Sequence, residues 1–189
     1  MKPSHIAIAV AACAALSTAQ AAAPVATSLS PGFTFNEYLD TATPVGRGLV
    51  DDDDTLYYID EKQVNGVKSW FIFFDPLTDG STVTATLQFD HPIVDVKVSI
   101  AGILLTNPKY SADAYQYPPS VFQGYALELP DDHISVSGNT LTLSWSARDP
   151  GDHIRVLTAV PEPATNAMLA AGLLGVGWLA RRRSVWRQG

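Results

Sequence analysis

The chain has 189 residues, a formal net charge of −7 and a single cysteine, Cys13. All 19 acidic residues lie between Glu37 and Glu162, together with seven of the 12 basic ones, so this part of the chain carries a charge of −12. Such an acidic surface repels phosphate and argues against a nucleic-acid partner. One cysteine cannot form a disulfide framework, and the length fits one folded domain between short terminal segments.

Residues 1–21 have the pattern of a secretory signal peptide. Lys2 supplies a positive start, residues 6–16 form an uncharged apolar run, and Ala19-Gln20-Ala21 is a small-x-small cleavage site. As a helix the apolar run is about 16 Å long, which is too short to cross a bilayer core of about 30 Å. We therefore predict an N-terminal signal helix that is removed after Ala21, and a mature chain without cysteine.

Residues 22–159 are predicted to form one all-β domain. Apolar and polar residues alternate with a period of two in several runs, which is typical of strands with one buried and one wet face. The clearest runs are 82–90, 93–100, 125–129 and 141–145. In the second of them, the alternation predicts inward side chains at Val94, Val96, Val98 and Ile100.

Turn residues support the same fold. Asn65-Gly66 and Gly138-Asn139 each separate two β-rich runs and predict hairpins, and residues 154–158 are expected to form the last strand. The domain shows no long helical stripe. With about eight or nine strands, we predict an antiparallel two-layer β-sandwich of jelly-roll type.

The C-terminal residues 160–189 hold a second signal. Pro161, Glu162 and Pro163 are followed by an uncharged span, 164–180, and then by Arg181, Arg182 and Arg183. As a helix the span covers about 25 Å, which is the short end of transmembrane length. A basic cluster stays on the cytoplasmic side, so we predict one transmembrane helix that holds the β domain on the other side.

This order of tripeptide, apolar helix and arginine cluster resembles the PEP-CTERM sorting signal. The resemblance implies that an exosortase, a membrane-embedded cysteine transpeptidase, recognises the tripeptide and processes the chain near it. It also implies an intermediate anchored in the inner membrane with a periplasmic domain, and then a place on the cell surface or in the extracellular matrix, among extracellular polysaccharide. The alternative is an ordinary membrane anchor whose prolines only begin a helix.

Two groups in the β domain are candidate binding residues. Asp51, Asp52, Asp53 and Asp54 could supply carboxylate oxygens to calcium, although consecutive residues of an extended chain point to opposite sides. Exposed aromatic rings suit sugars, and the Pro/Tyr-rich loop around 107–120 offers Tyr110, Tyr115 and Tyr117. The alternatives are a solvated acidic loop and tyrosines that cover one end of the core.

His133 and His153 each follow an aspartate and open an expected strand, so they could meet on one face as metal ligands if those strands are neighbours. No nucleophile-and-base constellation is present in the sequence, so we predict no catalytic residues and no required cofactor. The interpretation we favour is a structural or interaction protein of the cell envelope. A carbohydrate-binding module, with calcium as its candidate ion, is the alternative, and an envelope hydrolase is the third.

Overall fold

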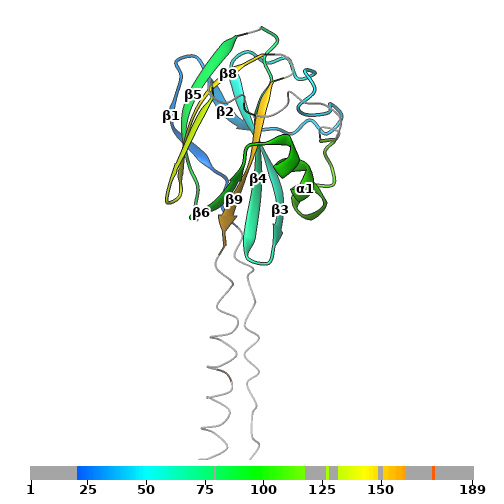
Figure 1. The fold of residues 1–189 in the computed structure, drawn as a ribbon, viewed down its shortest axis with the longest axis vertical. Helices are drawn as coiled ribbons and strands as arrows, with labels where there is room; N and C mark the ends of the chain where they lie inside the picture. Colours follow the sequence, from blue (N-terminus) through cyan, green and yellow to red (C-terminus); the bar gives the residue numbers. More distant parts are fainter. Residues whose placement is uncertain are drawn as a thin grey trace, which may run out of the picture. The chain divides into compact units, whose positions relative to one another are not determined.

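The structure is a computed structural model that describes residues 21–78, 80–117, 127, 132–148, 151–160 and 172. Within these residues the chain is mainly β, with two sheets and one helix (Figure 1). Apart from residues 21, 127 and 172, the predicted signal helix, transmembrane helix, sorting tripeptide and arginine cluster, and the expected strand at 125–129, lie outside the described residues. No helix among the described residues is long and apolar enough to span a membrane.

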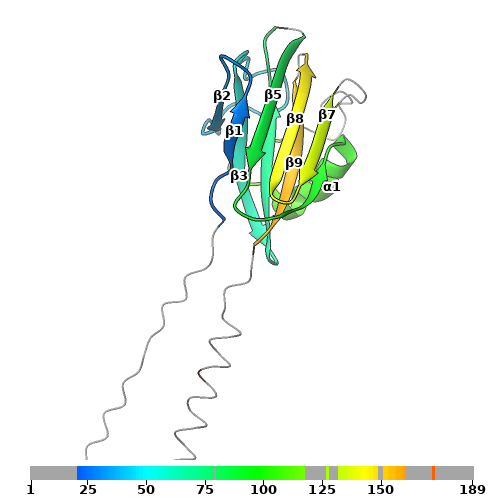
Figure 2. The ribbon, with the colours of Figure 1, turned by 90° about the vertical axis from the view of Figure 1, so that its left-hand side faces the viewer.

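The first sheet has four strands, all paired antiparallel. In spatial order they are β1 (Val25–Leu29), β5 (Ser81–Gln88), β8 (Thr140–Ala147) and β7 (His133–Ser137). Figure 2 shows these four strands side by side. β5 and β8 alternate buried and exposed residues, as the sequence predicts for strands with one wet face.

The second sheet has five strands. In spatial order they are β2 (Thr34–Glu37), β3 (Thr55–Val64), β4 (Val67–Phe74), β9 (Asp152–Ala159) and β6 (Ile93–Lys97). β4 and β9 are buried along nearly their whole length, on both faces. On one side of this sheet lies the first sheet, and on the other lies α1 (Ile100–Tyr110) (Figure 1).

One apolar core is shared by the two sheets. Its largest side chains come from both of them and are almost fully buried: Trp70, Ile72, Phe74, Leu87, Leu141, Leu143 and Trp145. A second apolar cluster lies on the other face of the five-stranded sheet, around Phe71, Phe73 and Ile103. The predictions of a mainly β fold and of two sheets are therefore confirmed, and the closed jelly-roll sandwich stays a prediction.

Both predicted hairpins are present. β3 and β4 meet at Asn65 and Gly66, whose φ angles are 53° and 72°, and two successive positive φ angles match the right-handed twist of the flanking strands. β7 and β8 meet at Gly138, with φ of 63°. Asn and Gly tolerate this region of φ better than other residues, which is why the sequence signal is reliable.

Three expectations about the strands are wrong. β2 pairs with β3 in parallel, so the five-stranded sheet is mixed rather than antiparallel. In the run 93–100, a register shift between Ile93 and Asp95 breaks the alternation and leaves Val94 55% exposed. The strand also ends at Lys97, because Ser99 accepts a hydrogen bond from the Gly102 N–H (3.2 Å) and caps α1, which begins at Ile100.

Candidate functional site

The end of β9 is the point at which the fold meets the predicted sorting segment. β9 lies between β4 and β6 and pairs with both of them. The Ala159 N–H donates to the Pro92 carbonyl (2.9 Å) and the Val160 N–H donates to the Gly66 carbonyl (2.7 Å). Val160 is only 3% exposed and belongs to the shared core. The backbone is therefore held until the residue that directly precedes Pro161.

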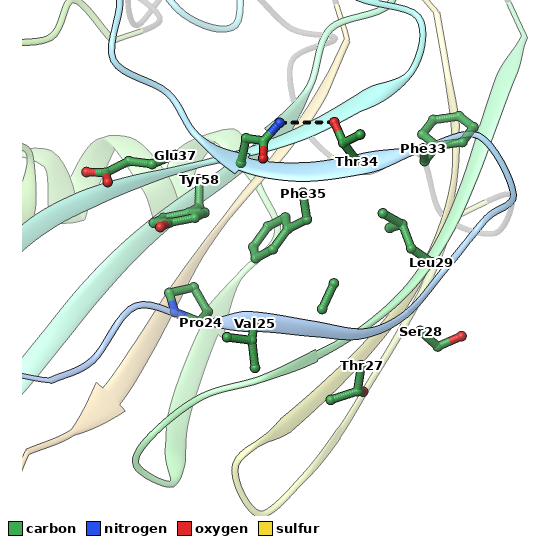
Figure 3. A pocket seen from close by; sticks show the side chains of 12 residues that line it. Pro24, Val25, Thr27, Ser28, Leu29, Phe33, Thr34, Phe35, Glu37 and Tyr58 are labelled. Atoms are coloured by element: carbon green, nitrogen blue, oxygen red, sulfur yellow. Dashed lines mark hydrogen bonds between the residues drawn. The ribbon is translucent and has the colours of Figure 1, made fainter.

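A groove opens between β1 and β2, the edge strands of the two sheets (Figure 3). Its volume is about 560 Å³. Its apolar lining includes Leu29 of β1, Phe35 of β2 and Phe33, which directly precedes β2. The ring centroids of Phe35 and Tyr58 lie 5.1 Å apart. Hydroxyl and amide groups surround them, and Glu37 is the one charged residue that lines the groove. The lining therefore combines aromatic and aliphatic side chains with hydroxyl and amide groups.

Sequence reasoning did not identify this groove. The signal that could have found it is the alternation Phe33-Thr34-Phe35-Asn36, which sends two aromatic side chains to one face of a short strand. What the sequence cannot show is that β2 joins the edge of a different sheet from β1. That arrangement places the two strands on either side of an open groove (Figure 3).

The three predicted tyrosines take part in packing. Tyr110 is 5% exposed. The hydroxyl of Tyr115 donates to the Tyr38 carbonyl (2.6 Å), and the ring of Tyr117 meets Phe71 edge to face at 5.2 Å. Burial raises the pKa of Tyr117. Tyr115 and Tyr117 thus join the second apolar cluster, whereas Tyr110 does not, and a shared sugar-binding surface of all three stays a prediction.

The predicted acidic cluster directs its carboxylates to separate partners. Both carboxylate oxygens of Asp53 accept hydrogen bonds from Thr78, from its N–H and its hydroxyl (2.8 Å each), and these bonds lower the Asp53 pKa. Asp52 accepts from the hydroxyl of Tyr57 (2.6 Å). Among the residues that the structure describes, no group of three or more metal-binding side chains comes together. A calcium site at Asp51–Asp54 therefore stays a prediction.

The two candidate histidine ligands lie on different sheets, so their strands are not neighbours and the condition for their meeting is not met. His133 is exposed on β7 of the four-stranded sheet, whereas His153 is fully buried on β9 of the five-stranded sheet. Burial, with a smaller effect of the nearby Arg155 charge, lowers the pKa of His153 to about 3. Its ring packs 5.2 Å from that of Phe71, so this histidine is a neutral core residue.

A buried ion pair lies under α1. Arg155 and Glu61 are both 0% exposed at the side chain and form two hydrogen bonds of 2.7 Å each. The other donors of Arg155 reach the Ile103 carbonyl (2.8 Å) and the Thr106 hydroxyl (2.7 Å) on α1. The pair therefore fastens the helix to the sheet, and its full burial favours this structural role over chemistry on an outside substrate.

The comparisons with known proteins identify the segment that follows β9. A family model for the PEP-CTERM protein-sorting motif matches residues 159–183, so its first two residues are the hydrogen-bonded Ala159 and Val160. No curated protein and no solved structure matches the chain significantly.

The sorting motif indicates a secreted protein that is processed at the membrane for the cell surface. More narrowly, the chain carries a PEP-CTERM sorting motif, which implies recognition by an exosortase, a membrane protein.

Proposed function

We propose that this chain is a structural or interaction protein of the cell envelope or extracellular matrix, without catalysis, that an exosortase-type system delivers. The observation that carries the proposal is the sorting-motif match, which begins where β9 ends. The charge of −12 between Glu37 and Glu162 supports an exposed, soluble domain, because like charges keep such surfaces apart.

The proposed route has three steps. The signal peptide, residues 1–21, exports the chain. Arg181, Arg182 and Arg183 then hold the helix 164–180 across the inner membrane with the β domain in the periplasm. Proline fixes its own φ angle and restricts the residue before it, so we expect the sequence Pro161-Glu162-Pro163 to favour an extended backbone. An enzyme that binds extended backbone can therefore act beside it.

Mass spectrometry of the cell-associated protein tests this proposal in a Gram-negative host that encodes an exosortase. We expect the native protein to lose Gly189, and Glu162→Ala to remain full length while still inserting into the membrane. Glu37→Ala is the matched control, because it removes an exposed acid from the β domain and should leave processing unchanged. A native protein that keeps Gly189 would contradict the proposal.

A carbohydrate-binding module is the second candidate, and the groove between β1 and β2 favours it. Aromatic side chains with hydroxyl and amide groups around them are the usual lining of a sugar site, and Glu37 is the one charged residue of this lining. Asn36→Ala changes the groove, whereas a Tyr115→Ala, Tyr117→Ala double substitution changes the loop predicted from sequence. Binding of uncharged polysaccharides to the two variants, with and without calcium, distinguishes the sites. No binding by the native protein would remove this candidate.

A further inference from the structure

The fold of this domain continues to the residue before the sorting tripeptide. β9 is buried from Asp152 to Thr158 and is paired along one side with β4 and along the other with β6. After the last paired residue, the Val160 N–H still binds the Gly66 carbonyl at 2.7 Å, and the Val160 side chain is 3% exposed. No flexible linker separates the core from the motif in the sequence.

The chemistry of Pro161 limits how far the hydrogen bonding of β9 can extend. Proline has no backbone N–H, so residue 161 cannot donate the next hydrogen bond of the ladder. The N–H bonding that holds Ala159 and Val160 therefore cannot continue at residue 161.

Enzymes that cut a chain act on backbone that is exposed and free of internal hydrogen bonds. We infer that processing of this chain breaks an amide bond only on the C-terminal side of Val160, so that the product keeps all of β9. The acyl side of the broken bond stays with the β domain and passes to water or to an amine acceptor, and the C-terminal fragment leaves with a new amino group. This inference rests on the proposed function only for the claim that processing occurs. The position limit at Val160 rests on the structure of β9.

The first test of the limit at Val160 uses purified protein. The full-length chain, purified in detergent, is digested with proteinase K under native conditions, and the intact mass of the resistant fragment is measured. We expect its C-terminus at Val160 or later. Native cuts within 152–160, at rates comparable with cuts after Val160, would overturn the inference.

A matched pair of variants shows whether the end of β9 sets the limit. Val160→Ala removes a buried anchor, and we expect cuts within 152–160 to become about tenfold faster, because local opening costs less. Val136→Ala makes the same change at a 45% exposed position of β7 and should leave these cuts unchanged. Equal rates in the two variants would show that Val160 does not hold the end of the strand, which overturns the inference.

The cellular product gives the second test. We expect its peptide map to contain Thr158, Ala159 and Val160 in full. A processed product that ends before Val160 overturns the inference while leaving the proposed function intact. A product that keeps Gly189, together with the expected proteinase K limit, contradicts the proposed function and leaves the protected end of the fold standing.

Discussion

The two faces of β9 meet very different surroundings. Ile154 and Val156 point into the core shared by the two sheets, which closes with apolar side chains. Their neighbours His153 and Arg155 point to the opposite face, where α1 covers the second cluster. On that face Ile103 of α1 is fully buried in the second cluster, and Arg155 also donates hydrogen bonds to the Ile103 carbonyl and the Thr106 hydroxyl. The difference teaches that the inner face closes by apolar area, whereas the outer face adds a few directed polar bonds to its apolar contacts.

Removing the charge of Arg155 should have the largest effect. Arg155→Met leaves the fully buried Glu61 without its partner, and breaking a buried pair in this way costs about 3–5 kcal/mol of unfolding free energy. Urea unfolding followed by circular dichroism measures this loss. The helix α1 should also become more accessible to hydrogen exchange, because two of its hydrogen bonds disappear with the guanidinium group.

The control for this prediction removes both charges. Glu61→Gln with Arg155→Met leaves no uncompensated ion, so the double variant should be more stable than Arg155→Met alone. If Arg155→Met lost less than about 1 kcal/mol, the pair would not be what docks α1.

Truncation in the shared core should come next. Leu143→Ala removes a fully buried side chain between the sheets and should cost about 3 kcal/mol. Leu105→Ala is the matched control on α1, where the side chain is 82% exposed and the expected change is within about 0.5 kcal/mol. Similar losses in the two variants would contradict this difference in burial.

The shared core could be predicted from the sequence because its strands have one wet face. In β5 and β8 the alternation of Val83, Leu87, Leu141 and Leu143 with polar residues states directly which side chains point inward. The two hairpins could be predicted for a local reason as well, since Asn65, Gly66 and Gly138 take positive φ angles that Asn and Gly tolerate.

The outer cluster could not be predicted in the same way. Its ion pair joins residues 94 positions apart, and a charged residue in a strand reads as solvent-facing until its partner is known. The helix α1 contains Gly102 and Pro108, which weaken its sequence signal. Its N-cap, Ser99, falls in the run 93–100, whose alternation predicts a strand. The groove depends on which sheet β2 joins, and no local pattern encodes that choice.

Acid should weaken the outer face through His153. Its folded pKa, about 3, is lowered from the usual 6.5 by burial first and by Arg155 second. Between these two values the unfolded chain binds a proton at His153 that the folded chain does not, so stability is present above pH 6.5 and falls as the pH falls. The slope from this group approaches about 1.4 kcal/mol per pH unit.

His153→Gln isolates that contribution. Acids with lowered pKa values, such as Asp53, also weaken the fold in this range, so the useful quantity is the difference in slope between the native chain and the variant. Unfolding free energies at pH 7, 5 and 4 measure it. Parallel curves would show that His153 is not a neutral buried group.

Lys62→Met should have the smallest effect on stability. Like Arg155→Met, it removes a cation of an ion pair near α1, here one that joins β3 to the segment after α1. Lys62 pairs with Asp113, but their side chains are 40% and 87% exposed, in contrast to the 0% of Arg155 and Glu61. Water already solvates an exposed pair, so its loss should cost at most about 0.5 kcal/mol. High salt should remove even that difference, since screening acts on exposed charges. A loss as large as that of Arg155→Met would mean that position near α1, rather than burial, decides how much an ion pair contributes to this face.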